Sequence, residues 1–386
     1  MRELFELEPG LVFLNHGSFG AVPKPVTEAL HAWQHRMEAN PVRFLGRESA
    51  GLLRHARQCL ASFMGAQADH LVFVPNATTG VNIVARSLAL QPGDEVLGTT
   101  LEYGACDATW QFVCAQRQAV YRRAAIALPF ERERFVAQVM AAVTPRTRLL
   151  FVSHVASTTA LVLPVAELVT AAHARGLPVL VDAAHAPGQV DLDLDAIGAD
   201  FSTGNCHKWL CAPKGTAFLH ARPEHHESLD ATVVSWGYVA GSGGHTGFDA
   251  YLGRSTFERR MQWQGTRDLC GCLAVEAAID FHRQHLTAPV RRRCHELAVA
   301  LMRDLSRHFA LPCIGSDDDF AQMAPIPVPA SDPEALRQAL YERHHIEVPV
   351  TQHDGRTFVR VSVQGYNTHA ELMRLHAALL QECGGG

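Results

Sequence analysis

The sequence of 386 residues lacks several features that would assign it to a special class of protein. No apolar run approaches the roughly 18 residues that a membrane-spanning helix requires, and the first residues lack the basic start and apolar stretch of a signal peptide. A net charge of −5 provides no basic field for nucleic acid. We therefore expect a cytoplasmic protein without a membrane or nucleic-acid partner, and the length predicts two domains.

The sequence also lacks cysteines at characteristic spacings. Its ten cysteines are scattered, and the close pairs Cys206/Cys211 and Cys270/Cys272 do not have the spacing of a zinc knuckle or a CxxC redox motif. We therefore expect free thiols in a reducing compartment, and we predict no metal site.

Lysine is scarce as well, because only Lys24, Lys208 and Lys214 occur. Asp182 ends the apolar run 177–182, and Lys208 follows the next expected strand. This order suits pyridoxal phosphate (PLP), since the lysine amine forms a Schiff base with the cofactor and the carboxylate keeps its pyridine nitrogen protonated. A structural arginine is the alternative partner for the buried Asp182 carboxylate.

The first two thirds of the chain alternate short β-branched runs with amphipathic stretches. This alternation predicts crossover units and a mostly parallel sheet that is covered on both faces. The clearest helix signal is at 164–176, with Pro164 in the first turn and Gly176 after the last. The expected strands are 71–74, 95–98, 148–153, 178–181, 201–203 and 216–220.

The pattern changes near residue 268 and predicts a smaller α+β domain. Its expected helices are 268–285, 289–309, 333–344 and 368–383, and its expected strands are 323–329 and 357–363. The Gly/Ser-rich stretch 239–253 is expected to be a mobile loop between the two parts. We predict a large domain at 15–262 and a small domain formed by 1–14 and 263–386.

Two further segments carry groups suited to the same cofactor. Ala77, Thr78 and Thr79 begin a helix after a strand, where N–H groups and hydroxyls bind phosphate, although threonine is also an ordinary N-cap. Tyr103 opens the next helix and would either stack on a planar ring or simply pack. His185 would reach the phenolate oxygen of the cofactor or be a core histidine.

The order of these motifs resembles one family along essentially the whole chain. Ala-Thr-Thr, Glu-Tyr-Gly, Val-Asp-Ala-Ala-His and Asn-Cys-His-Lys-Trp precede Gln-Gly-Thr-Arg-Asp at 264–268. They resemble the class V aminotransferase-fold PLP enzymes, and most of all the isopenicillin N epimerase-like branch, which is related to the cysteine desulfurases. The resemblance implies an α/β fold, the PLP-dependent transferase fold type I, with a mostly parallel seven-stranded sheet in the large domain and a smaller α+β domain.

The resemblance also implies a role for each site residue. The cofactor-binding residues would be Ala77, Thr78, Thr79, Tyr103, Ser157, Asp182, His185, Asn205, His207 and the catalytic Lys208. Thr266 would reach the phosphate of the neighbouring subunit, which requires a homodimer. The substrate side would be formed by Asn15, His16 and Arg360. Arg360 would hold the substrate α-carboxylate through a two-pronged contact.

Three departures from the cysteine desulfurases narrow the implied function. Ser157 stands where they hold an asparagine, Asn205 replaces their usual serine, and the stretch 344–356 lacks their nucleophilic cysteine. Ordinary persulfide chemistry is therefore not expected.

The resemblance implies an enzyme of epimerase or transferase type that acts at the α-carbon of an amino acid through an external aldimine. A C–S lyase acting on a cysteine-derived substrate is the alternative. A third possibility, a non-catalytic binding module, is disfavoured because it needs neither Lys208 nor Arg360. Epimerisation requires a second acid, and His154, His16 and Tyr103 are unranked candidates.

Overall fold

Seven strands form the central sheet of the protein. The computed structural model describes residues 1–239, 252–330 and 332–384. In spatial order the strands are β2 (Leu71–Val74), β8 (Ala217–Ala221), β7 (Phe201–Asn205), β6 (Val179–Asp182), β5 (Thr147–Ser153), β3 (Glu95–Thr99) and β4 (Val120–Ala124). β8 is antiparallel to both neighbours, and the other strands are parallel to one another. The predicted mostly parallel seven-stranded sheet is confirmed.

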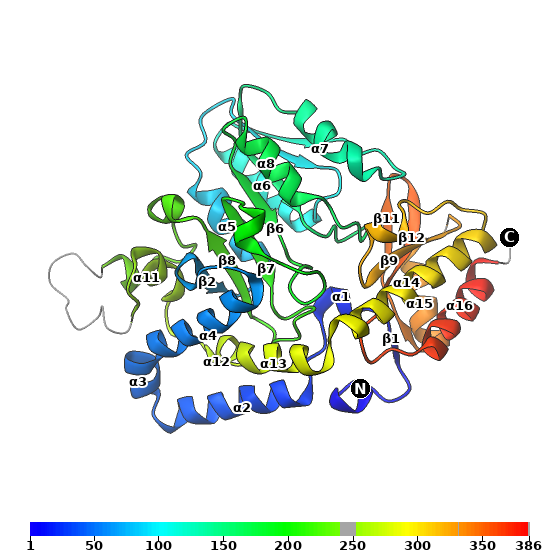
Figure 1. Ribbon diagram of the computed structural model, residues 1–386, viewed down its shortest axis with the longest axis horizontal. Coiled ribbons are helices and arrows are strands. Elements are labelled where there is room, and N and C mark those ends of the chain that lie inside the picture. The colour runs from blue at the N-terminus through cyan, green and yellow to red at the C-terminus, as the bar shows by residue number, and fades with distance from the viewer. Residues whose placement is uncertain (240–251, 331, 385–386) are drawn as a thin grey trace.

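Both faces of this sheet are buried, because successive side chains of a strand point to opposite faces. On β5, Leu150 and Val152 belong to one hydrophobic cluster, whereas Leu149 and Phe151 belong to another. The helices that connect the strands cover the sheet in Figure 1. These are α5 (Ala77–Ser87), α6 (Gly104–Gln116), α7 (Arg132–Ala141), α8 (Val165–His173) and α9 (Leu194–Ile197).

One strand of the sheet was not found by its local pattern. The six strands expected from β-branched runs all exist within a residue or two of their predicted bounds. β4 is the seventh, at the edge of the sheet beside β3. Its sequence is Val-Tyr-Arg-Arg-Ala, and only Ala124 is buried. An exposed edge strand needs no apolar run, so hydrophobicity gave no signal there.

A second, three-stranded antiparallel sheet lies in the C-terminal part. Its order is β11 (Val350–His353), β12 (Arg356–Ser362) and β9 (Met323–Val328). The helices beside it in Figure 1 are α14 (Ala288–His308), α15 (Pro333–His344) and α16 (His369–Cys383). β1 (Val12–Phe13) pairs in parallel with β10 (Ile346–Glu347), so the N-terminal strand lies beside this part. The domain bounds themselves stay a prediction.

The remaining helices connect the two sheets or flank them. They are α1 (His16–Phe19), α2 (Lys24–Ala39), α3 (Pro41–Arg43), α4 (Ser49–Met64), α11 (Thr256–Gln262), α12 (Cys270–Leu273) and α13 (Val275–His285). Short turns of tighter or wider helix are η1 (Arg2–Leu4), η2 (Phe44–Glu48), η3 (Ala68–His70), η4 (Pro223–Ser228), η5 (Trp236–Tyr238) and η6 (Asp317–Asp319). The helix expected at 268–285 is divided at Ala274 into α12 and α13. Most of the expected loop, residues 240–251, lies outside the described residues.

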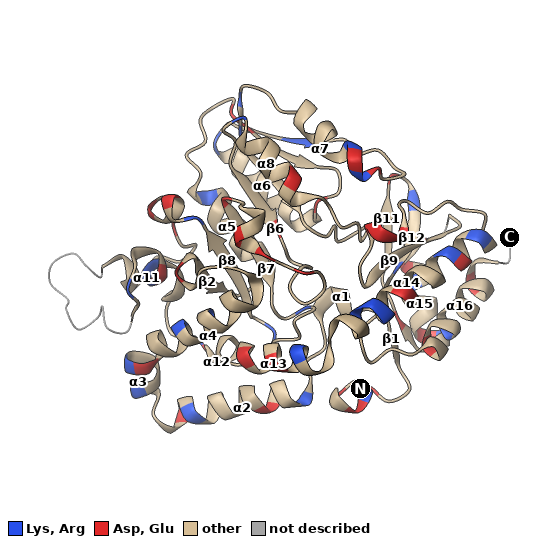
Figure 2. Ribbon diagram, viewed as in Figure 1, with Lys and Arg blue, Asp and Glu red and all other residues tan. Residues whose placement is uncertain are grey.

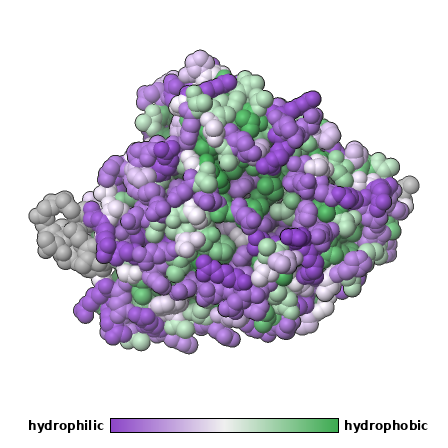
Figure 3. All heavy atoms as spheres, viewed as in Figure 1, coloured by the Kyte–Doolittle hydropathy of each residue, from purple (hydrophilic) through white to green (hydrophobic). Residues whose placement is uncertain are grey.

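The outer surface mixes charges of both signs. Figure 2 shows acidic and basic residues interspersed along outer helices such as α2 and α14. Figure 3, in the same view as Figure 1, shows apolar residues gathered between the two sheets, with polar residues around them. Among the described residues, no helix is both long and apolar enough to span a membrane.

Candidate active site

A cavity of about 420 Å³ opens at the carboxyl edge of the central sheet. Ends of strands and starts of helices meet there, as is usual for ligand sites in α/β sheets. The predicted residues that line it are Ala77, Thr78, Tyr103, Ser157, Asp182, His185, Asn205, His207 and Lys208. Residues far apart in the sequence are therefore brought together, in the arrangement that the motifs implied.

Lys208 lies three residues after β7 and faces a neutral imidazole. Its Nζ is 3.1 Å from His185 Nε2, and the indole N–H of Trp209 donates to His185 Nδ1 over 3.4 Å. Burial, and then the nearby charges of Lys208 and Arg360, hold the pKa of His185 well below its usual value. Burial, and then Arg360, lower the pKa of Lys208 to about 8, although Asp182 acts in the opposite direction. The amine therefore loses its proton more readily than an exposed lysine.

Asp182 is the last residue of β6 and lies buried at the cavity wall. Its Oδ1 accepts a hydrogen bond from the Ala184 amide (2.9 Å), and its Oδ2 accepts one from the Cys106 thiol (3.5 Å). Burial raises the pKa of this carboxyl group. No arginine of the described chain pairs with it, so the structural-arginine alternative is wrong. A protonated ring nitrogen bound in the cavity would provide the missing cation, and in this respect the site fits PLP.

The start of α5 fits a phosphate. The N-cap is Asn76, whose Oδ1 accepts hydrogen bonds from the amide (2.8 Å) and hydroxyl (3.0 Å) of Thr79. Thr79 is thus turned toward the cap and does not line the cavity, and the threonines are not the N-cap of this helix. Ala77 donates its amide to Asn205 Oδ1 (2.8 Å). Within the described chain, the Thr78 hydroxyl has no protein partner and lines the cavity, as expected of an anion-binding group.

Two rings near the cavity differ in their exposure. The Tyr103 side chain is 46% exposed and lines the cavity at the start of α6, so it is not a core residue. His207 lies partly buried beside Lys208, and its Nδ1 is 3.1 Å from the Thr216 carbonyl oxygen. The Tyr103 ring is therefore free to cover a planar ligand, whereas the His207 ring is tied to the backbone.

Arg360 lies on β12 and is 4% exposed. Its Nη1 donates to the carbonyl (2.5 Å) and hydroxyl (3.3 Å) of Ser157, and its Nη2 donates to Ser18 Oγ (3.3 Å). Both serines line the cavity. Its Nε has no partner, and no carboxylate of the described chain lies within ion-pair distance. Burial lowers the pKa of Arg360 to about 10, because no anion of the described chain stabilises the buried cation.

Five of the predicted residues are absent from the cavity wall. Two of them, Thr79 and Arg360, bond to residues that line it, and the other three are His16, Asn15 and Thr266. His16 is buried, with Nδ1 3.0 Å from the Tyr366 hydroxyl and Nε2 3.1 Å from the Lys208 carbonyl oxygen, so it supports the backbone of Lys208. Asn15 accepts a hydrogen bond from Ser18 and donates one to Glu347 (3.1 Å). Asn15 and His16 therefore do not themselves line the cavity, and their place on the substrate side stays a prediction. Thr266 lies exposed between α11 and α12, away from the cavity of its own chain.

Three further residues, which the sequence motifs did not single out as site residues, shape the site. Lys214 lines the cavity and donates to the Gly20 carbonyl oxygen (3.0 Å). Glu102 is buried, accepts hydrogen bonds from the amide (2.8 Å) and hydroxyl (2.6 Å) of Ser153, and has its pKa raised to about 8 by burial. The scarcity of lysine and the Glu-Tyr-Gly motif at 102–104 were signals that could have identified Lys214 and Glu102. Ser18 gave no such signal.

The sheet and the lysine–aspartate pair at its carboxyl edge define a PLP-type enzyme of fold type I, and comparison with known proteins agrees. The sequence profile of the family described as aminotransferase class-V matches residues 12–375. Isopenicillin N epimerase from Streptomyces clavuligerus is 38% identical over 97% of this chain and 95% of its own length. A probable L-cysteine desulfhydrase, chloroplastic, from Arabidopsis thaliana is 28% identical over 96% of this chain and 83% of its own.

A solved structure shares the same fold. The apo cysteine desulfurase from Thermococcus onnurineus NA1 superposes with a TM-score of 0.82 at 20% identity, covering 100% of this chain and 98% of that one. The chain belongs to the aminotransferase class-V family of PLP-dependent enzymes, as its motifs implied.

Proposed function

We propose that this chain is a PLP-dependent enzyme that acts at the α-carbon of an amino acid with isopenicillin N epimerase-like chemistry. The observation that carries the proposal is the buried guanidinium of Arg360. It has no carboxylate partner in the described chain, and it contacts Ser157 and Ser18 at the wall of the cavity that also contains Lys208. A guanidinium in this position suits the α-carboxylate of an amino acid.

Different residues of the cavity would bind PLP and transfer the proton. Bound PLP would supply an electron sink for the bonds at the substrate α-carbon. Asp182 would hold the proton on the ring nitrogen, and Thr78 with the start of α5 would bind the phosphate. Lys208 would anchor the cofactor and then take the α-proton, a role helped by its lowered pKa.

Epimerisation needs a group that returns the proton on the opposite face. Of the three candidates, Tyr103 lines the cavity, whereas His16 and His154 are buried and absent from its wall in the described part of the chain. Burial also lowers the pKa of His16 to about 3 and that of His154 to about 4, so at neutral pH neither ring is the imidazolium that would act as the acid. We therefore assign the second proton transfer to Tyr103.

A C–S lyase is the second candidate function. It is favoured by the similarity to the probable L-cysteine desulfhydrase and by the absence of a cysteine from 344–356. Such an enzyme would release a β-substituent from a cysteine-derived substrate, with Lys208 again holding the α-proton. Arg360 would hold the carboxylate in both reactions, so this residue does not distinguish them.

We further propose a cytoplasmic homodimer in which Thr266 reaches the phosphate bound by the neighbouring subunit. The exposed position of Thr266, away from its own cavity, supports this assignment. We retain 15–262 as the large domain and 1–14 with 263–386 as the small domain.

Reconstitution with PLP followed by a screen of amino acids in deuterated water tests the function. Borohydride should fix the cofactor on the peptide that contains Lys208. Exchange of the α-hydrogen with inversion identifies an epimerase, cofactor cycling that depends on a keto acid identifies a transferase, and release of pyruvate and ammonia identifies a lyase. A colourless protein, or label on another peptide, would refute the proposal.

A further inference from the structure

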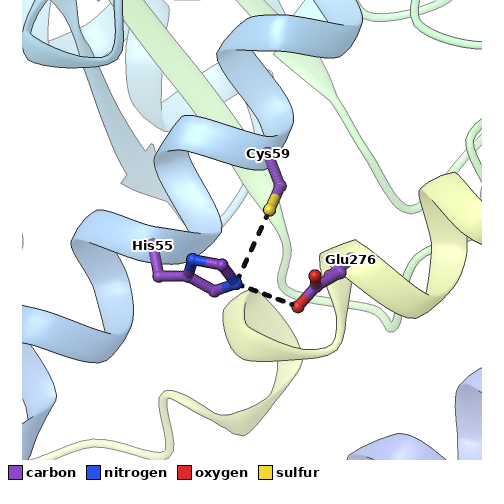
Figure 4. A group of neighbouring side chains, drawn as sticks. All are labelled: His55, Cys59 and Glu276. Carbon is purple, nitrogen blue, oxygen red and sulfur yellow. Dashed lines mark hydrogen bonds and ion pairs between the residues drawn. The ribbon is translucent and has the colours of Figure 1, made fainter.

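Three side chains with different metal-binding groups meet on the surface between α4 and α13. His55 and Cys59 are one turn apart on α4, and Glu276 projects toward them from the first turn of α13, as Figure 4 shows. His55 Nε2 is 3.3 Å from Glu276 Oε2 and 3.8 Å from Cys59 Sγ. All three ligand atoms lie within 4.8 Å of one another, and none of these residues lines the active-site cavity.

These separations suit a tetrahedral metal ion. Zinc binds imidazole nitrogen, carboxylate oxygen and thiolate sulfur at about 2.0–2.3 Å, which places neighbouring ligand atoms about 3.3–3.8 Å apart. The measured 3.3 Å and 3.8 Å fall at the two ends of that interval. Residues four apart on a helix lie on the same face, so His55 and Cys59 need no backbone change to share one ion.

An ordinary surface ion pair between His55 and Glu276 explains only part of this arrangement. Their side chains are 63% and 50% exposed, and exposed pairs stabilise a protein by at most about 1 kcal/mol. The pair does not account for the thiol on the same imidazole nitrogen. A hollow of about 310 Å³ beside them is also lined by Asp280 and Arg283. Asp280 adds an acceptor for a bound water, whereas Arg283 opposes a cation.

We propose that His55, Cys59 and Glu276 bind a divalent cation of the zinc class, with water as the fourth ligand. This proposal departs from the sequence-based expectation of no metal site, which rested on local spacing alone. Glu276 is too distant in sequence from the α4 residues for any local motif to include it. The ion would link α4 to α13 and stabilise their contact by mass action.

Binding must release the thiol proton, because the thiolate is the metal ligand. Affinity for the cation is therefore expected to rise with pH.

Cobalt(II) is the most direct probe, because a sulfur ligand gives it a charge-transfer band in the near ultraviolet and a tetrahedral site gives intense bands in the red. The PLP-loaded protein, stripped of metal with a chelator, is titrated with Co²⁺ and then with Zn²⁺. We expect one equivalent of Co²⁺ per chain, a sulfur band, and displacement by Zn²⁺. The Cys59→Ser variant should lose the band and bind Zn²⁺ at least about 100-fold more weakly. The Glu276→Gln variant should weaken binding but keep the band.

The matched control is Cys313→Ser, which removes another partly buried thiol that has no such neighbours among the described residues. It should keep both the band and the affinity. A competing cluster of His70, Asp195 and His220 contains no sulfur. The proposal fails if no stoichiometric binding occurs, if the band survives Cys59→Ser, or if binding lacks a sulfur band and is lost in His220→Ala. Turnover of the Cys59→Ser variant should match that of the unmodified chain.

Discussion

The two edges of the central sheet each hold a buried aspartate, and the surroundings of the two aspartates shift their pKa values in opposite directions. At the amino edge, Asp200 accepts hydrogen bonds from His173 (2.8 Å), His225 (2.9 Å) and the Val179 amide (2.8 Å). Burial alone would raise its pKa, but these partners lower it to about 2. At the carboxyl edge, Asp182 has one amide and one thiol, and its pKa is raised. The carboxyl group of Asp200 is thus stabilised by partners within the protein, whereas that of Asp182 lacks a cationic partner that a bound ligand could supply.

Two buried arginines repeat this contrast. Arg57 is 1% exposed and forms an ion pair with Glu258 at 2.9 Å. Arg360 is equally deep but has no carboxylate partner in the described chain. A buried charge without a counter-ion lowers stability, so its presence indicates selection for binding. The active site is therefore recognisable by which charges lack partners, more than by which charges are present.

The largest expected effect comes from removing the amine at the carboxyl edge. Lys208→Ala should lower kcat by about 10³ to 10⁴-fold, because both the covalent anchor and the base are lost. The melting temperature of the cofactor-free protein should hardly change. Steady-state kinetics together with mass analysis after borohydride treatment measure this. A variant that retains more than a tenth of the activity would exclude Lys208 as the base.

The two arginines can be compared directly. Arg360→Lys keeps the charge but loses the two-pronged geometry, so kcat/KM should fall by about 100-fold, mainly through KM. Arg57→Lys is the matched control and should lower the melting temperature while leaving KM unchanged. Equal losses of kcat/KM in both variants would show that Arg360 acts through stability.

The two aspartates should respond oppositely to removal of their charge. Asp200→Asn should lower the free energy of unfolding of the cofactor-free protein by about 3 kcal/mol, because two histidines lose their anion. Asp182→Asn should leave it unchanged or raise it, while weakening PLP binding. Denaturant unfolding and PLP titration measure the two effects. Destabilisation of the cofactor-free protein by Asp182→Asn would mean that this carboxylate already has its partners.

The smallest effect concerns pH. The folded-state pKa of Asp200 is depressed below the ordinary value of 3.8, so its contribution is complete above that value and is lost as pH falls toward 2. The loss should be about 2 kcal/mol of unfolding free energy. Asp182 has a raised pKa and contributes the opposite slope. Acid unfolding curves of the parent and the Asp200→Asn variant measure this contribution of Asp200 to the free energy of unfolding. It should be absent from the variant.

Most of the fold could be predicted because it depends on buried, local patterns. Six apolar runs and the alternation with helices identified the central sheet, and only β4 escaped because its side chains face solvent. Several candidate site residues could be proposed from the sequence because they end a strand, follow one or begin a helix. Asp182 ends β6 and Lys208 comes shortly after β7, and both line the cavity.

Residues that act through spatial neighbours were harder to identify. The family resemblance placed His16 on the substrate side, and in the structure its Nε2 contacts the Lys208 carbonyl oxygen. Ser18 bonds to both Asn15 and Arg360, from opposite ends of the sequence. Such contacts depend on how the C-terminal sheet packs against the N-terminal segment. The hydrophobic periodicity of a single segment cannot predict how that segment packs against a distant one.

The hydrogen bond from the Ala77 amide to Asn205 has a consequence for how the enzyme acquires its cofactor. It joins the first residue of α5 to the last residue of β7, three positions before the lysine. The two walls of the cavity are thereby fastened to each other before anything enters. PLP should therefore bind between these two elements with little cost of ordering them.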